Sequence, residues 1–367
     1  MVKLAAKTVL LALILWGIAY VVRQPLPFYW GNSSFQRKYE YFKPRANEYN
    51  VLLFGSSVIY RHINPVLFDR RCPSSFPCHS FNFGVQAMSN PESHFMLEQL
   101  LADATVDLSS VKFILMDLGQ LEDLTEENVK SVRAKYWVTP HMLQVSYSIL
   151  PDQTGDRFSR LQNGWRYAKA HIGYQFNLGL YPSIADWHRN EKEELDSALF
   201  RKDLGRNLDG FLSLTHDYRF SWRAEEYLQE RDDQRLVSIY NTSDFLDCED
   251  DYRHPDTQKD HLAEEAMRLI NLCKEQGIHL MFMVPPRIPT HRSYPAVHLL
   301  PKEHIMAMVD PREYPQFWEP DNLFDRGHFS LAGSREYTIA LMKELRPLLD
   351  SLGQANFPEM EAARATE

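Results

Sequence analysis

Residues 51–60, Val-Leu-Leu-Phe-Gly-Ser-Ser-Val-Ile-Tyr, contain a short apolar run that stops at Gly55 and is followed by two serines. A run of this length, bounded by small residues, is typical of a buried parallel strand that turns sharply into a loop or helix. We therefore expect Ser57 to lie at the carboxyl edge of a sheet, where open α/β sheets bind ligands. A serine at this edge needs a base before it can act as a nucleophile.

A histidine that can serve as this base lies near the other end of the chain, in Phe324-Asp-Arg-Gly-His-Phe. Asp325 precedes His328 by three residues, in a glycine-containing loop that leads into a helix. In such a loop the aspartate can hold one ring nitrogen and leave the other for the serine. Ser57, His328 and Asp325 are therefore the candidates for a catalytic triad.

The two segments together resemble the first and last sequence blocks of the SGNH/GDSL hydrolase superfamily. The resemblance implies an α/β fold, namely a three-layer flavodoxin-like (SGNH) domain with a parallel sheet. It also implies that Ser57 is the nucleophile and that Asp325 and His328 complete the triad.

The oxyanion hole follows from the same resemblance. Asn82-Phe83-Gly84 lies where the second block belongs, so the N–H groups of Ser57 and Gly84 are expected donors to an oxyanion. The third block departs from the family, because Leu121 stands where Gly-x-Asn places asparagine. Either Gln120 supplies the amide from one position earlier, or the third donor is missing.

A strand–helix–strand rhythm supports an α/β fold independently of this resemblance. Apolar runs at 80–84, 111–116 and 278–284 predict further strands, and helical spacing predicts helices at 91–101 and 260–276. Strands that alternate with helices imply right-handed crossovers and a parallel sheet. We place this SGNH-like domain at 50–353, after a connector at 24–49 and before a polar tail at 354–367.

Residues 121–247 separate the third strand from the next periodic helix and are predicted to be a helical insertion. Helices are expected at 126–135, 139–149 and 157–180. An insertion of this length acts either as a lid or partner surface over the site, or as a packing elaboration. Its tryptophans, Trp165, Trp187 and Trp222, either stack on sugars or pack in a core.

The amino terminus, residues 1–23, has a short cationic end followed by an apolar run that only Lys7 interrupts. This pattern predicts a signal anchor, a transmembrane helix that remains uncleaved, with a cleaved signal peptide as the alternative. The very short amino-terminal tail favours an exported body in the periplasm or outside the cell. The protein would then contact the membrane through its N-terminal helix.

Composition excludes one class of partner. The net charge of −9 and the pI near 5.9 give no basic field for nucleic acid. No cysteine or histidine group has metal-ligand spacing, so neither a metal nor a cofactor is expected. Cys72 and Cys78 flank a proline-bounded loop that a local disulfide can staple, whereas Cys273 lies on an apolar helix face.

Two further residues are candidates for substrate binding. Arg287 follows the Pro285-Pro286 pair at the end of a predicted strand, and His62 comes shortly after Ser57. Arg287 can bind a carboxylate or phosphate, with a rim salt bridge as the alternative. His62 either lines the pocket or is an exposed residue of a helix.

These residues predict serine-dependent acyl transfer, with water as acceptor in an esterase or a sugar hydroxyl in an acyltransferase. An N-terminal anchor before an SGNH-like domain resembles the arrangement in alginate-type O-acetyltransferases and in the D-alanyl transfer protein of teichoic acid modification. The resemblance implies O-acyl groups of a cell-envelope or secreted polysaccharide as substrate, and a multi-pass membrane acyl exporter as partner. The alternative is a catalytically degenerate SGNH-like module that binds glycan or scaffolds an envelope assembly.

Overall fold

The structure is a computed structural model that describes residues 2–88, 90–119, 121, 124–152, 156–190, 203–230, 233, 260–286 and 294–356. In this part of the chain a five-stranded parallel sheet has the strand order β2-β1-β3-β4-β5, and a second, two-stranded sheet is antiparallel. The strands are β1 (Val51–Phe54), β2 (Ser80–Asn82), β3 (Phe113–Asp117), β4 (His279–Val284), β5 (Ile305–Ala307), β6 (Leu323–Asp325) and β7 (His328–Phe329).

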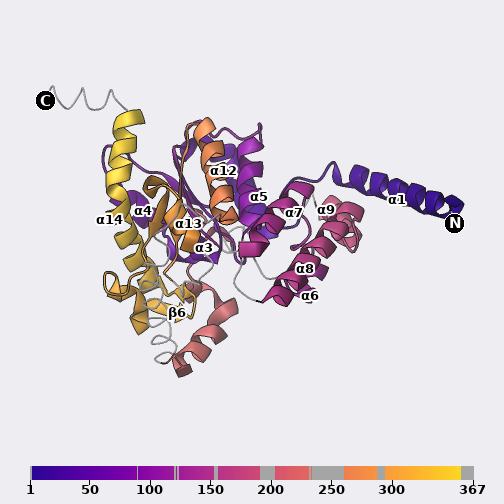
Figure 1. The fold of residues 1–367 in the computed structure, drawn as a ribbon. Coiled ribbons are helices and arrows are strands. Elements are labelled where there is room, and N and C mark those ends of the chain that lie inside the picture. Colours follow the sequence, from indigo (N-terminus) through magenta and orange to yellow (C-terminus); the bar gives the residue numbers. More distant parts are fainter. Residues whose placement is uncertain are drawn as a thin grey trace.

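Helices connect and cover the strands (Figure 1). They are α1 (Val2–Arg23), α2 (Ser33–Phe42), α3 (Ser57–His62), α4 (Pro65–Arg71), α5 (Glu92–Ala102), α6 (Glu126–Lys130), α7 (Pro140–Ile149), α8 (Arg157–Phe176), α9 (Tyr181–Asn190), α12 (His261–Glu275), α13 (Tyr294–Leu299), α14 (Leu331–Asn356) and a helix at 221–230. Short 3-10 helices include η1 (Lys43–Glu48), η2 (Leu150–Asp152), η3 (Leu214–His216), η4 (Tyr218–Phe220), η8 (Lys302–His304), η9 (Pro315–Trp318) and η10 (Pro320–Asn322).

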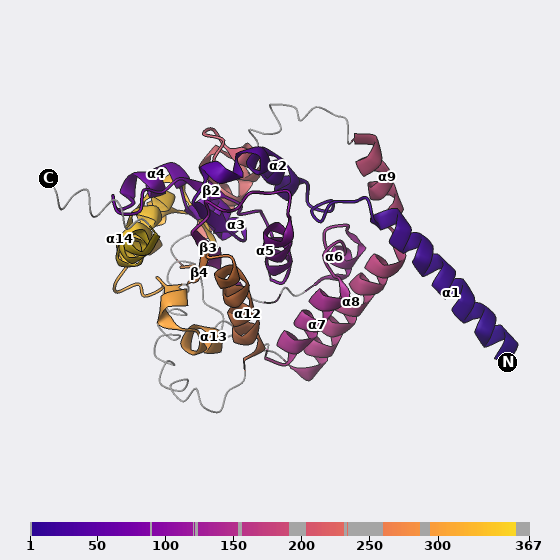
Figure 2. The same cartoon turned by 90° about the horizontal axis from the view of Figure 1, so that it is seen from above.

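The parallel sheet is the middle layer of three, because successive strand residues point to opposite faces and both faces are buried. Leu52 and Phe54 of β1 belong to a core that includes α2, α5 and α12. Val51 and Leu53 belong to a second core with α3, α4 and α14. Figure 2 shows α4 and α14 on one side of the strands and α5 and α12 on the other.

The register of the sheet brings the site-bearing turns to one edge. Leu53 pairs with Asn82 of β2, and Phe54 pairs with Met116 of β3. The residues that follow these strands therefore leave the sheet at neighbouring points along its carboxyl edge. Ser57 begins α3 directly after the β1 turn, and Asp117 is the last residue of β3.

Helix α1 is long and apolar enough to cross a membrane, with a mean hydropathy of 2.0 over its most apolar window. Only 6% of that window is buried against the rest of the protein. A core helix of a soluble protein would be mostly buried. The length and exposure of α1 are those of a membrane span or a signal sequence.

The insertion is helical; the helix expected at 139–149 is present as α7, but the other two expected helices are shorter than the sequence predicts. The helix expected at 126–135 ends at Lys130, because Ser131 leaves the helical conformation and the chain continues through turns. The helix expected at 157–180 ends at Phe176, because Asn177 adopts a left-handed conformation with φ of 52°. Strand β5 has only three residues, two half-buried and one exposed, and was not expected from the sequence.

The three cysteines among the described residues have the roles that the sequence predicts. Cys72 and Cys78 form a disulfide, with their Cα atoms 5.8 Å apart, and close the loop between α4 and β2. Cys273 is a buried free thiol on α12, which confirms its prediction as a core residue.

Candidate functional site

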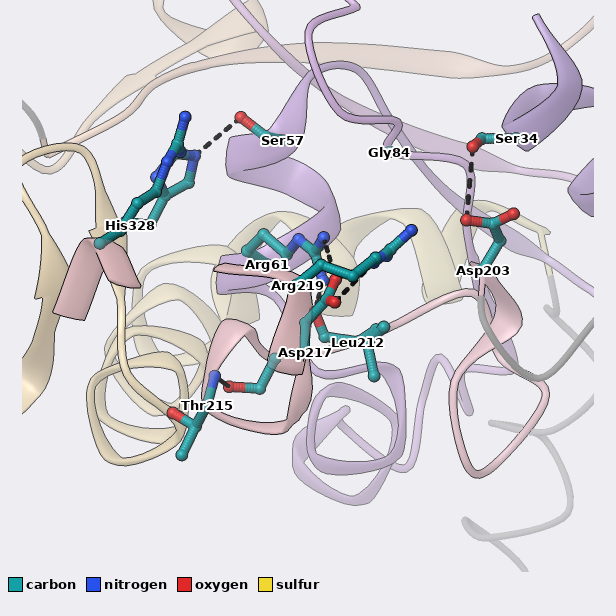
Figure 3. A network of polar contacts seen from close by, with 12 residues as sticks. Ser34, Ser57, Arg61, Gly84, Asp203, Leu212, Thr215, Asp217, Arg219 and His328 are labelled. Carbon is teal, nitrogen blue, oxygen red and sulfur yellow. Dashed lines mark hydrogen bonds and ion pairs between the residues drawn. The ribbon is translucent and has the colours of Figure 1, made fainter. Parts of the chain in front are cut away.

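Ser57, His328 and Asp325 form a continuous chain of contacts at the carboxyl edge of the sheet. Ser57 Oγ lies 2.9 Å from Nε2 of His328, and Nδ1 of the same ring lies 2.8 Å from Oδ1 of Asp325. Figure 3 shows the Ser57 side chain turned toward the His328 ring. With its proton on Nδ1, the ring donates to the aspartate and accepts the serine O–H, which is the arrangement of a general base.

The β6–β7 hairpin holds the acid and the base. Oδ1 of Asp325 also accepts the Gly327 N–H at 2.8 Å, so the carboxylate is fixed from its own loop. Burial alone would raise the pKa of Asp325, but hydrogen bonds from His328 and Gly327 and the charge of Arg223 outweigh it and hold the pKa below its usual value. The carboxyl group is therefore ionised at neutral pH and can hold the imidazole in one tautomer.

The turn before the nucleophile is fixed by Ser56. Its side chain caps α3 by accepting the Val58 N–H at 3.2 Å, and its own hydroxyl donates to Asp117. Ser57 is thus the first residue of a capped helix rather than part of an open loop. The chain from Asp117 through Ser56 sets where the Ser57 hydroxyl points.

The second expected oxyanion donor is occupied. The N–H of Gly84 donates to Oδ1 of Asn82 at 2.8 Å, while the Asn82 amide donates to the carbonyls of Ile59 and Ile63. Nζ of the buried Lys38 donates to the Gly84 carbonyl and so helps to hold the loop that follows β2 in place. Gly84 would have to leave its bond with Asn82 to serve an oxyanion, so its role stays a prediction.

The remaining predicted site residues divide into two groups. Gln120 and Arg287 lie outside the described residues.

His62 is described, and its position corrects the expectation that it contacts substrate. The side chain is 1% exposed, and its Nε2 accepts the Phe329 N–H at 3.2 Å, behind the strand that carries His328. His62 lies at the end of α3, whose inner face packs against β7, so it supports the base instead of lining a pocket.

A pocket of about 350 Å³ opens beside the triad, between the β6–β7 turn and the helix at 221–230. Arg223 approaches the Asp325 carboxylate to 3.4 Å from this helix, and Trp222 is 55% exposed. The insertion therefore contributes one wall of the pocket. The lining residues are Trp222, Arg223, Glu226, Tyr227, Asp325, Arg326, Gly327 and His328.

A buried ion pair fastens this part of the insertion to the helix that carries Ser57. Arg61 Nη2 lies 2.9 Å from Oδ2 of Asp217, and the two side chains are almost fully buried. Arg61 also donates to the Leu212 carbonyl at 2.7 Å, and Arg219 makes a second pair with Asp217. Figure 3 shows this network below the Ser57 helix.

Sequence reasoning missed Asp117, Arg61, Asp217 and Arg223. A signal existed for Asp117, because a carboxylate at the end of a central strand neighbours the turn after the adjacent strand. None existed for the other three, because the contacts that join Arg61 to Asp217 and Arg223 to Asp325 link residues more than 100 positions apart in the chain.

Comparison of the chain with models of known families, with curated proteins and with solved structures gives no match.

Proposed function

We propose that this protein is a membrane-anchored serine acyltransferase or esterase of the SGNH type. The observation that carries the proposal is the contact chain from Ser57 Oγ through His328 to Asp325. Two further features support it. The strand order β2-β1-β3-β4-β5 is that of flavodoxin-like sheets, and the serine lies at their ligand-binding edge.

The reaction would proceed through an acyl-serine. Ser57 Oγ attacks the carbonyl carbon of an O-acyl ester while His328 Nε2 takes the hydroxyl proton. The N–H of Ser57 can donate to the resulting oxyanion, with Gly84 and Gln120 as the other expected donors. When the tetrahedral intermediate collapses, His328 returns the proton to the departing alcohol oxygen. An acceptor hydroxyl, from water or from a sugar, then attacks the acyl-serine while His328 takes its proton. The bond between the acyl group and Ser57 Oγ breaks as His328 returns that proton to the serine.

The setting of this chemistry belongs to the same proposal. An apolar helix at the N-terminus supports anchoring in a membrane with the body outside the cytoplasm. There the substrates would be O-acyl groups of a cell-envelope or secreted polysaccharide, and a multi-pass membrane acyl exporter would supply the acyl group. The exposed Trp222 beside the triad supports a sugar-binding role, because aromatic faces stack on sugar rings.

A second candidate function is binding or scaffolding without catalysis. The observation that favours it is the hydrogen bond between the Gly84 N–H and Asn82, which occupies one of the expected oxyanion donors. A module of this kind would retain the pocket and bind a glycan without transferring an acyl group.

Covalent labelling by a fluorophosphonate separates the two functions. We expect the folded wild-type protein to be labelled at Ser57, identified by peptide mass spectrometry, and the Ser57→Ala and His328→Ala variants to lose the label. Ser109→Ala, at an exposed loop serine, is the matched control and should label like the wild type. Folded wild-type protein that takes up no label, or labels equally in Ser57→Ala, would overturn the acyl-transfer proposal and favour glycan binding.

A further inference from the structure

Helix α8 of the insertion carries an exposed apolar stripe along its length. Phe158, Leu161, Trp165 and Ile172 are 75%, 64%, 58% and 44% exposed, respectively. Their spacing of three, four and seven residues places them on one helical face, and we call them the α8 stripe. The residues of α8 that are buried against the protein, Asn163, Tyr167, Ala170 and Gly173, lie on the opposite face.

The charges of α8 are all of one sign. The helix contains Arg157, Arg160, Arg166 and Lys169 and no acidic residue. Arg166 and Lys169 lie near Glu126 of α6, at 3.8 and 3.1 Å. An apolar face with Phe, Leu and Trp, on a helix whose charged residues are Lys and Arg, is the composition of helices that lie in a membrane interface.

The carboxyl-terminal end of α8 is fastened to the last two turns of α1. Trp16 Nε1 donates to the Gln175 side chain at 2.9 Å, and the Asn177 amide donates to the Ala19 carbonyl at 3.0 Å. The guanidinium of Arg23 lies over the Tyr174 ring, 3.9 Å from its centre. A tryptophan and an arginine at the end of a span are the residues that mark the membrane–water interface. The α1 contacts thus place the end of α8 at interfacial depth.

The α8 stripe faces the side toward which α1 projects. Figure 2 shows α8 between α12, which covers the sheet, and the free length of α1. Because the buried face of α8 points to the body, the stripe points away from it. A bilayer that contains α1 would therefore meet the stripe.

We propose that the α8 stripe lies in the headgroup region of the membrane that α1 spans, so that the protein has two points of contact with the bilayer. The rest of the described surface fits this assignment. Outside α1, nine large hydrophobic side chains are exposed among the described residues, and seven of them lie between 147 and 181. Lipid is favoured over a protein partner as the occupant because the neighbouring α1 is itself exposed and apolar.

This contact would fix the orientation of the body. A single helix lets the attached domain rotate and tilt, whereas a second contact at α8 restrains the insertion against the surface. The inference rests on α1 as the span and is independent of the chemistry at Ser57. Accordingly, the Ser57→Ala substitution should leave the membrane contact unchanged.

The test uses the full chain in liposomes of phosphatidylcholine and phosphatidylglycerol. Single cysteines at Phe158→Cys or Leu161→Cys carry an environment-sensitive fluorophore, in a Cys248→Ser/Cys273→Ser background that keeps the Cys72–Cys78 disulfide. Lys343→Cys on α14 is the aqueous control, and Leu13→Cys on α1 is the lipid control. Quenching is measured with spin-labelled lipid and with iodide.

We expect spin-labelled lipid to quench the labels at 158 and 161 at least twofold more than the label at 343, and iodide to show the reverse order. Labels at 158 and 161 that iodide quenches as strongly as at 343 would overturn the proposal. Protection from both quenchers would also overturn it, in favour of self-association through the stripe. A label at 13 that lipid does not quench would remove its basis, the insertion of α1.

Discussion

The carboxylate of Asp117 holds Ser56, the residue directly before the candidate nucleophile. Its Oδ1 accepts the Ser56 N–H at 3.1 Å, and its Oδ2 accepts the Ser56 hydroxyl. Because Ser56 in turn caps α3, the position of Ser57 depends on a side chain at the end of a different strand. Asp117 is a positioning residue, since it acts on Ser57 only through Ser56.

Replacing Asp117 should slow the labelling of Ser57 by a fluorophosphonate while the protein remains folded. Asp117→Ala leaves the buried Ser56 N–H and hydroxyl without their acceptor, and a displacement of the nucleophile by about 1 Å costs about 10²-fold in rate. Asp117→Asn keeps one acceptor oxygen and should lose less than about tenfold. The measurement is the fluorophosphonate labelling rate of protein shown to be folded. An unchanged rate in folded Asp117→Ala would limit Asp117 to a structural role.

Gly55 should tolerate no side chain. Its φ of 142° is a conformation that L residues rarely adopt, and a Cβ there would overlap Oδ1 of Asp117. We expect Gly55→Ala to lower the free energy of unfolding by about 3 kcal/mol, from backbone strain and overpacking together. Gly277→Ala is the matched control, because φ is also positive, at 72°, but the space is open. Urea unfolding measures the free energy of unfolding of both variants. If the two variants lost equal amounts, the close approach of Asp117 to Gly55 would not contribute to the loss.

Strands β1 and β3 of the sheet were predictable because they are fully buried. The runs at 51–54 and 113–116 have no polar residue and end at a glycine or an aspartate, so length and punctuation are enough to identify them. β5 lacks this signal, since its three residues are exposed or half-buried at the sheet edge. The N-terminal helix was equally predictable, because its composition alone distinguishes it from the body.

Part of the site could be predicted for a different reason. The turn after β1 and the loop at 325–328 carry recognisable residue types at fixed spacing, and the structure brings them within hydrogen-bond distance. The wall of the pocket could not be predicted, because long-range polar contacts such as Arg61 to Asp217 help to position residues 203–230. The residues that make such contacts do not recur at regular intervals in the sequence, so the spacing that identifies helices and strands does not predict them. His62 was misread because burial of a polar side chain depends on its partner, Phe329, far along the chain.

Asp69 should make the protein less stable as the pH rises through weakly acidic values. Burial raises its pKa to about 6, although the Ser80 N–H donates to the carboxylate at 3.1 Å. In the unfolded chain the pKa is about 3.9. Between pH 4 and pH 6 the folded state therefore binds more protons than the unfolded state, and the free energy of unfolding falls with rising pH.

The Asp69→Asn variant isolates this contribution. We expect its melting temperature to match that of the wild type near pH 4, to exceed it increasingly up to pH 6, and to stay above it by a constant amount at higher pH. Thermal unfolding at four pH values between 4 and 7.5 measures the difference. Asp107→Asn, at an exposed carboxylate, is the control and should show no such increase. A difference that is independent of pH would contradict the raised pKa.

Replacing Asp217 alone should lower the free energy of unfolding more than replacing both Arg61 and Asp217. Asp217→Leu leaves the buried guanidinium of Arg61 with the Leu212 carbonyl but without its carboxylate, and stranding a buried charge costs about 3–5 kcal/mol. The double variant Arg61→Met/Asp217→Leu contains no stranded Arg61 charge, so we expect it to be more stable than Asp217→Leu. The control is the pair of Arg312, which is 72% exposed, and Asp310; Asp310→Leu leaves the arginine charge in water and should therefore cost less than Asp217→Leu.

Urea unfolding in detergent micelles measures all three variants, and the labelling rate of Ser57 gives a second readout. Because Arg61 joins α3 to the segment that leads into the helix at 221–230, Asp217→Leu should also loosen the wall of the pocket while the triad contacts remain. We therefore expect small and bulky fluorophosphonates to label this variant at more similar rates than they label the wild type. A loss no larger than that of Asp310→Leu, with unchanged discrimination between the probes, would show that the insertion is held to the site by other contacts.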